Sequence, residues 1–199
     1  MTQEERFAKV IAMFDDYNQK DPHLESWQGQ QVPKELLYAQ RMSERLKSYM
    51  PDAPEYLVLA ARCQHIGRWE IPRNTYPMDR KGYLQWRNQL KVHHCNIADR
   101  IMRSYGYDDE TIQKVKSLLA KEQLFHHRPD TQALEDVICL VFIEFYLEDF
   151  ATKHDDAKLV EILRKTLHKM SAKAIESAGK IAVSERVAGL IGQAVTKSL

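Results

Sequence analysis

The sequence has few cysteines, and their spacing matches neither a disulfide framework nor a metal-binding pair. There are three, Cys63, Cys95 and Cys139, and no two of them form a Cys-x-x-Cys motif. An odd number in this arrangement is typical of a protein that folds in a reducing compartment. Each cysteine lies beside apolar residues in a helical pattern. We therefore expect all three to be buried as small hydrophobic side chains.

The chain also lacks an excess of charge of either sign and any long hydrophobic run. It has 29 basic and 28 acidic residues, for a formal charge of +1. This balance argues against a general nucleic-acid or membrane-surface binder, although it leaves room for local basic patches. The first residues lack the cationic start and apolar run of a signal peptide, and the longest apolar run, residues 137–143, is too short to span a bilayer. The sequence predicts a cytoplasmic protein without a membrane partner.

Glycine and proline are scarce, with seven of each, and they punctuate long segments of helical periodicity. No segment shows sustained alternation of apolar and polar residues, so we expect no sheet. The pattern predicts an all-α fold, one compact domain over residues 1–199 with about seven to eight helices. The expected helices cover residues 3–19, 34–49, 55–65, 83–105, 109–125, 130–152, 155–177 and the chain from about 184. Asp130 or Thr131 is the expected N-cap of the sixth.

The least regular stretch is residues 68–82, which is rich in proline, arginine and aromatic residues. Loops of this length in a compact domain are often functional. The basic and aromatic residues in and around it are Arg62, Arg68, Arg73, Arg80, Arg87, Trp69, Tyr76, Tyr83 and Trp86. Arginine binds phosphate or carboxylate bidentately, but it also stacks on aromatic rings to hold an irregular loop. Both interpretations stay open on the sequence alone.

Three further positions carry groups that can perform chemistry. His65 lies where the third expected helix ends, and is either a metal ligand or proton carrier or a cap for the free carbonyls. His94 falls in the apolar stripe of the fourth helix, and is either functional or a core histidine with one hydrogen bond. Glu135 and Asp136 precede a nearly all-apolar helix segment, where a buried carboxylate needs a partner or a metal. Alternatively, the two carboxylates only complement the helix dipole.

These segments together resemble the HD superfamily of helical, metal-dependent phosphohydrolases, over about residues 35–145. Residues 64–72, Gln-His-Ile-Gly-Arg-Trp-Glu-Ile-Pro, are similar to the pattern His-Asp-Ile-Gly-Lys-x-x-Ile-Pro of its HD-GYP branch. Further similar positions are Gly82-Tyr83-Leu84 with Trp86, His94 with Ala98 and Ile101-Met102, His126-His127-Arg128, and Leu134-Glu135-Asp136. The helices of residues 155–199 would then pack on this HD-like core.

The resemblance places the metal-ligating positions of that family at Tyr38, Gln64, His65 and Asp136, of which only Asp136 keeps the family's residue. Tyrosine and neutral glutamine are poor replacements for imidazole. Three outcomes follow. A rearranged site can use His65, His94 and Asp136, with or without Glu135. His65 can act as an acid or base without metal. Otherwise catalysis is lost and a ligand pocket is kept.

The whole chain also resembles an uncharacterised family with the string QHIxRWxIPRxxYPxxRxGYLxWR, whose members are sometimes labelled glutamyl-tRNA synthetase. Residues 65–67 are similar to half of the synthetase motif His-Ile-Gly-His, and residues 169–173, Lys-Met-Ser-Ala-Lys, are similar to Lys-Met-Ser-Lys-Ser. That chemistry needs a parallel nucleotide-binding sheet, which the sequence does not predict. We interpret residues 169–173 as an ordinary exposed helix turn.

Two functions are therefore expected from the sequence. The first is a metal-dependent hydrolase of a nucleotide-like or other small phosphate ester, in which His65, His94 and Asp136 bind a divalent metal that lowers the pKa of a water. His65, Glu135 and Lys121 would be its catalytic residues. The ligand would contact Tyr38, Gln64, Arg68, Arg73, Tyr76, Arg80 and Arg87. The second is a non-catalytic module that binds a phosphorylated ligand or a partner protein through residues 68–87. RNA binding by the same loop is a third, less favoured class, which predicts strong salt dependence.

Overall fold

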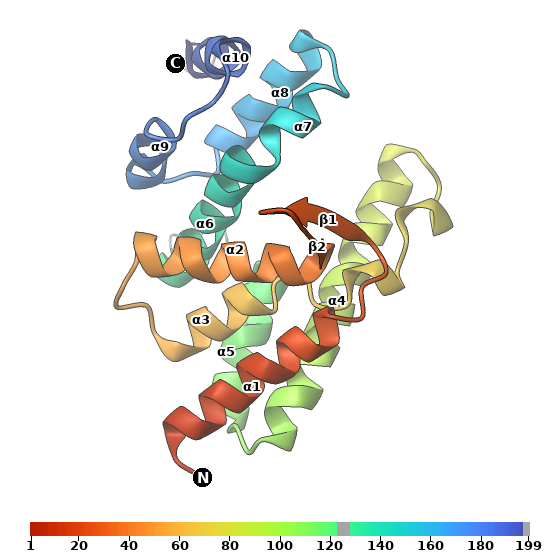
Figure 1. Ribbon diagram of the computed structural model, residues 1–199, viewed down its shortest axis with the longest axis vertical. Coiled ribbons are helices and arrows are strands. Elements are labelled where there is room, and N and C mark those ends of the chain that lie inside the picture. The colour runs from red at the N-terminus through yellow and green to blue at the C-terminus, as the bar shows by residue number, and fades with distance from the viewer. Residues whose placement is uncertain (123–127, 197–199) are drawn as a thin grey trace. The chain divides into compact units, whose positions relative to one another are not determined.

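The structure is a computed structural model that describes residues 1–122 and 128–196, and the chain forms two compact units that divide after Glu122. In the first unit, helix α1 leads into a β-hairpin that lies against α2, and α3 and α5 pack on each other (Figure 1). Its elements are α1 (Gln3–Asn18), β1 (Leu24–Trp27), β2 (Gln30–Pro33), α2 (Lys34–Tyr49), α3 (Glu55–Arg62), the 3-10 turns η1 (Arg68–Glu70) and η2 (Arg73–Thr75), α4 (Arg80–Ser104) and α5 (Asp109–Ala120).

The second unit is helical throughout the part that the structure describes. Its elements are α6 (Pro129–Phe145), α7 (Leu147–Ala151), α8 (Asp156–Leu167), α9 (Ala172–Ala178) and α10 (Glu185–Thr196). Helix α8 packs along α10, and α6 packs against α7 and α9. Helix α6 is buried on almost every side from Ala133 to Ile143, as the apolar run over residues 137–143 predicts.

The all-α class is confirmed, but the described residues form ten α-helices where seven or eight were expected. The helix expected over residues 130–152 changes direction at Tyr146, and the helix expected over 155–177 stops after Leu167 and restarts at Ala172. At that restart Ser171 is the N-cap and Met170 is buried, so residues 169–173 are not an ordinary exposed helix turn. The expected caps of α6 are also wrong, because Arg128 is the N-cap and Pro129 opens the helix.

The expectation of no sheet is wrong as well, because β1 and β2 form an antiparallel hairpin. Trp27 pairs with Gln30, so the loop is the two residues Gln28 and Gly29, whose φ angles are 50° and 79°. Positive φ at both positions is the geometry of a tight type I′ hairpin turn. The sequence signal was weak, since glutamine is not the usual residue there and each strand has only four residues.

Polar contacts hold α1 and α2 in place around the first unit. Helix α2 begins after Pro33, which has no side-chain cap, and the Oδ2 of Asp21 accepts the Glu35 N–H at 3.0 Å instead. Arg62 of α3 donates twice to the Asp15 carboxylate of α1, with both distances 2.6 Å. These contacts fix the start of α2 and the end of α3, which is where the candidate site lies.

The cysteine prediction is confirmed: Cys63, Cys95 and Cys139 are buried and unpaired. None of the helices in the described part of the chain combines the length and the apolar character needed to span a bilayer.

Candidate functional site

The turn after α3 contains a glycine in the left-handed region of backbone conformation. Gly67 has φ 68°, and a Cβ at this position would lie 2.6 Å from Cδ1 of Ile97 and 3.1 Å from Nε2 of His93. The Gly67 N–H donates to Oδ1 of buried Asn18 at 3.3 Å. Because the turn is packed this tightly, the side chains of Gln64, His65 and Arg68 are fixed relative to α4.

His94 of α4 meets this turn from the other side. Its Nδ1 lies 2.6 Å from the Ile66 carbonyl oxygen, which can only accept, so Nδ1 carries the hydrogen. Burial lowers the pKa of His94 from 6.5 to about 3, so the ring is neutral at physiological pH. The Nε2 of this neutral ring is a bare acceptor, and it has no hydrogen-bond partner among the described residues.

His65 lies next to His94, with 6.0 Å between the ring centroids, and stacks on Tyr38 at 4.1 Å. Its Nδ1 is 3.3 Å from Oε2 of Glu35, and its Nε2 is 3.4 Å from Nη1 of Arg68. Burial and then the charge of Arg68 lower the pKa of His65 well below its ordinary value. A neutral ring that donates from Nδ1 to Glu35 and accepts at Nε2 from Arg68 satisfies both contacts.

Glu35 is a buried carboxyl beneath His65 that the sequence analysis missed. Burial raises its pKa from 4.5 to about 7, against the charge of Arg68, whose Nε lies 3.7 Å away. Near neutral pH this carboxyl is therefore only partly ionised. A glutamate in the first turn of a helix is usually explained by the helix dipole, so the sequence carried no signal for its burial.

These residues border a small pocket with a volume of about 20 Å³, which is room for about one water molecule. It is lined by Gln64, His65, Arg68, Arg87, Leu90, Lys91, His94, Leu119 and Lys121. Four of these side chains are cationic, and the carboxyl of Glu35 lies close to two of the lining residues, His65 and Arg68. Arg87 makes no hydrogen bond or ion pair with another described residue. Lys91 was missed by the sequence analysis, although its spacing of three from His94 puts both residues on one helix face.

The arginines of the irregular loop divide between the two expected roles. Arg68 lines the pocket and also lies over the Trp86 ring, 4.7 Å from its centroid. Arg73 does not line the pocket; its guanidinium donates to the carbonyls of Tyr76, Pro77 and Asp79 at 3.1, 2.8 and 3.2 Å. Arg80 is exposed at the start of α4, and neither it nor Tyr76 is among the lining residues. The loop is thus largely held by its own arginine–carbonyl and arginine–aromatic contacts.

Glu135 and Asp136 belong to the second unit, where both carboxylates have partners. Asp136 accepts from the Ser171 N–H at 2.8 Å, from the Ser171 hydroxyl at 2.6 Å and from the Gln132 amide at 2.9 Å. Glu135 lies 3.6 Å from Nζ of Lys169. Asp136 therefore anchors the start of α9, which is a structural explanation for its burial. Its joint role with His65 and His94 stays a prediction, as does the catalytic role of Glu135.

The first unit by itself does not fit a divalent metal. Its pocket supplies two imidazoles, whereas a zinc site normally takes three or four protein ligands. No group of three or more His, Cys, Asp or Glu side chains in residues 1–122 and 128–196 is placed to hold a metal ion. The cationic lining would also repel a metal. The His126-His127 pair, which the HD resemblance included, lies outside the described residues.

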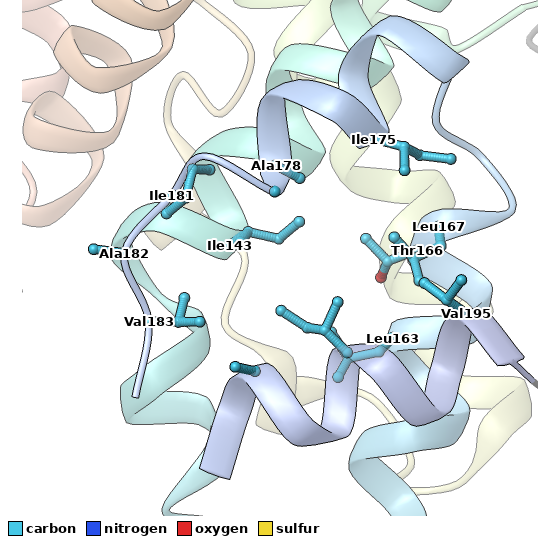
Figure 2. Close-up of a pocket in the computed structure, with 13 residues that line it drawn as sticks. Ile143, Leu163, Thr166, Leu167, Ile175, Ala178, Ile181, Ala182, Val183 and Val195 are labelled. Carbon is cyan, nitrogen blue, oxygen red and sulfur yellow. The ribbon is translucent and has the colours of Figure 1, made fainter. Parts of the chain in front are cut away.

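The second unit has a larger and quite different hollow. Its volume is about 430 Å³, and its lining is aliphatic except for Thr166, whose hydroxyl donates to the Ile162 carbonyl. Figure 2 shows side chains from α6, α8, α9 and α10 and from the segment after α9 directed toward a shared space. No charged side chain lines it. Nothing in its lining selects a polar ligand.

Comparisons with known proteins give one match. Neither the curated proteins nor the solved structures include a significant match to this chain. They also give no independent support for membership of the HD superfamily. A family model described as "Domain of unknown function (DUF4202)" matches residues 8–191, which is most of the chain and includes the pocket and both units. The chain therefore belongs to this family of unknown function.

Proposed function

We propose that the protein binds the phosphate group of a small phosphorylated ligand in the first-unit pocket, without a metal. The observation that carries this proposal is the pocket lining, where Arg68, Arg87, Lys91 and Lys121 surround two neutral histidines. Guanidinium groups bind phosphate through paired N–H donors, and ammonium groups add charge. Arg87, which has no hydrogen-bonding partner among the described residues, has its donors available for such a ligand.

The small volume limits how the ligand enters. A phosphate group is larger than the one water molecule that the pocket accommodates. Lys91 and Lys121 are both partly exposed and carry long flexible chains, so their ammonium groups can swing outward to admit it. The phosphate group would then lie in the pocket while the rest of the ligand remains outside.

Metal-free hydrolysis is the second candidate, favoured by the His65–Glu35 pair. A histidine whose Nδ1 donates to a carboxylate is the usual arrangement of a general base. However, the pKa of His65 lies well below its ordinary value, whereas an efficient base has a pKa near the working pH. This mismatch favours binding over hydrolysis.

The test is a calorimetric titration of inorganic phosphate into the protein at low salt. We expect Arg87→Gln to weaken binding by roughly tenfold or more, because a charged hydrogen-bonding pair is lost. Arg80→Gln is the matched control, since Arg80 is exposed in the same helix but does not line the pocket, and it should leave the affinity unchanged. Absence of phosphate binding by the wild type, or equal losses in the two variants, would refute the proposal.

A further inference from the structure

One buried acceptor in the pocket has no hydrogen-bond partner. The side chain of Gln64 lines the pocket and the residue is only 5% exposed, yet its Oε1 has no partner in the described chain. A buried amide oxygen without a donor is energetically unfavourable. Most buried polar atoms in proteins are paired, so this oxygen points to a ligand that brings a donor.

His94 presents a second acceptor to the same pocket. Its Nδ1 hydrogen is committed to the Ile66 carbonyl oxygen, so Nε2 has only its lone pair to offer. No described residue donates to it. The pocket therefore combines four cationic side chains with two acceptors, Gln64 Oε1 and His94 Nε2.

The ligand that matches this combination is an anion that still carries a hydroxyl hydrogen. A fully ionised tetrahedral anion has only hydrogen-bond acceptors. It can pair with the cationic side chains, but its oxygens would be repelled by the acceptor atoms Gln64 Oε1 and His94 Nε2. A singly protonated phosphate meets the cations with its charged oxygens and the two acceptors with its P–OH group. Building on the proposed function, we infer that the pocket selects the singly protonated form of a phosphate group over fully ionised anions of the same shape.

Inorganic phosphate and sulfate are the probes, compared at about pH 6, where inorganic phosphate is mainly the monoanion and still carries hydroxyl hydrogens, whereas sulfate carries none. Both are tetrahedral, and sulfate carries the higher negative charge, so charge alone would favour sulfate in a cationic pocket. We expect phosphate to bind about tenfold more tightly or better, because sulfate has no hydrogen to donate to Gln64 Oε1 or His94 Nε2. Comparable binding, or tighter binding of sulfate, overturns the inference but leaves the proposed anion site standing. If neither anion binds, both fail.

A substitution of Gln64 tests whether this residue is the source of the selectivity for phosphate over sulfate. Gln64→Met keeps the length of the side chain but removes the amide oxygen, and the phosphate-to-sulfate affinity ratio should fall severalfold. Gln89→Met is the matched control on an exposed glutamine of α4, and its ratio should equal that of the wild type. Arg87→Gln should weaken both anions and preserve the ratio. An unchanged ratio in folded Gln64→Met protein contradicts the inference, and the wild-type comparison decides it if that variant does not fold.

Discussion

The two units each have a hollow, and the smaller of the two hollows has the more polar lining. The first-unit pocket holds about 20 Å³ and has four cationic side chains and two acceptors in its lining. The second-unit hollow holds about 430 Å³ and is lined by aliphatic side chains and one hydroxyl that is already bonded. Ligand sites normally combine a cavity with a few convergent polar groups, and only the smaller hollow has them. Volume alone points to the second unit, whereas the chemistry of the lining points to the first.

The backbones around the two hollows also differ. Among the described residues, positive φ angles occur only in the first unit, at Gln28, Gly29, Gly67, Gly106 and Lys121. Two of these, Gly67 and Lys121, lie beside or in the pocket. The glycine that lines the second-unit hollow, Gly179, has ordinary helical angles. Special backbone geometry therefore accompanies the polar pocket and is absent from the described lining of the apolar one.

The largest expected effect is that of Gly67→Ala. The substitution combines a left-handed backbone angle with a Cβ 2.6 Å from Cδ1 of Ile97, and should lower the free energy of unfolding of the first unit by roughly 3 kcal/mol. Urea unfolding followed by tryptophan fluorescence measures it, because the three tryptophans, Trp27, Trp69 and Trp86, all lie in this unit.

Two alanine substitutions serve as controls for this effect. Gly106 also has a positive φ, 78°, but a Cβ there would meet nothing within 4 Å, so Gly106→Ala should cost only about 1 kcal/mol of backbone strain. A Cβ at Gly179 would make only ordinary contact, at 3.5 Å, so Gly179→Ala should leave the helical unfolding measured by circular dichroism within about 0.5 kcal/mol of the wild type. Equal losses at Gly67 and Gly179 would remove the contrast between the two hollows.

The second effect is a pH dependence confined to the first unit. Burial raises the pKa of Glu35 to about 7, so the folded state takes up a proton more readily than the unfolded chain, and stability from this group is lost as pH rises from 4.5 through 7. Burial lowers the pKa of His94 to about 3, so stability from that group is lost as pH falls from 6.5 toward 3. Between pH 4.5 and 6.5 the two contributions oppose each other.

Substituting either residue should reveal the contribution that the other makes to the pH dependence of stability. Glu35→Gln should make the loss of stability between pH 7 and 4.5 steeper than in the wild type, by roughly 2 to 3 kcal/mol. His94→Gln should make the loss shallower by a similar amount, because the unfolded chain no longer gains a proton at this position. Urea midpoints from tryptophan fluorescence at several pH values check both. Parallel pH profiles for the two variants would show that burial does not shift the pKa values of Glu35 and His94 in opposite directions.

The sequence predicted much of this pocket because its residues carry recognisable chemistry at helical spacing. His65, His94, Gln64, Arg68, Arg87, Tyr38 and Lys121 were named from pattern and resemblance, and the structure brings them together on α2 to α5 and the turn after α3. Arg73 and Arg80 were grouped with them because of charge alone. The sequence could not show that the Arg73 guanidinium donates hydrogen bonds to three carbonyl oxygens of its own loop.

The helix boundaries failed where a local interaction overrides periodicity. The apolar spacing of residues 155–177 continues through a break, because Leu167 before it, Met170 within it and Ala174 after it are all buried. Ser171 stops the pattern by capping α9 and by donating to Asp136, a contact between residues 35 positions apart. Such distant hydrogen bonds leave no periodic trace in the sequence.

The smallest expected effect is that of Lys121→Gly, which should change stability and phosphate binding in opposite directions. This residue ends α5 in the left-handed conformation, with φ 55°, and its side chain lines the pocket. A non-glycine residue pays about 1–2 kcal/mol for that conformation, so Lys121→Gly should raise the stability of the first unit by roughly 0.5 kcal/mol after the entropy cost of glycine. The same change removes an ammonium group and should weaken phosphate binding by roughly fivefold.

Gln28→Gly is the matched control, because Gln28 also has a positive φ, 50°, but lies in the hairpin loop away from the pocket lining. It should raise stability by a similar amount and leave phosphate affinity unchanged. Strained residues that persist in folded proteins cluster at functional sites, where the strain positions a working group. If Lys121→Gly gains stability and keeps full affinity, the Lys121 ammonium group takes no part in phosphate binding, and the proposed site is reduced to the other three cationic side chains.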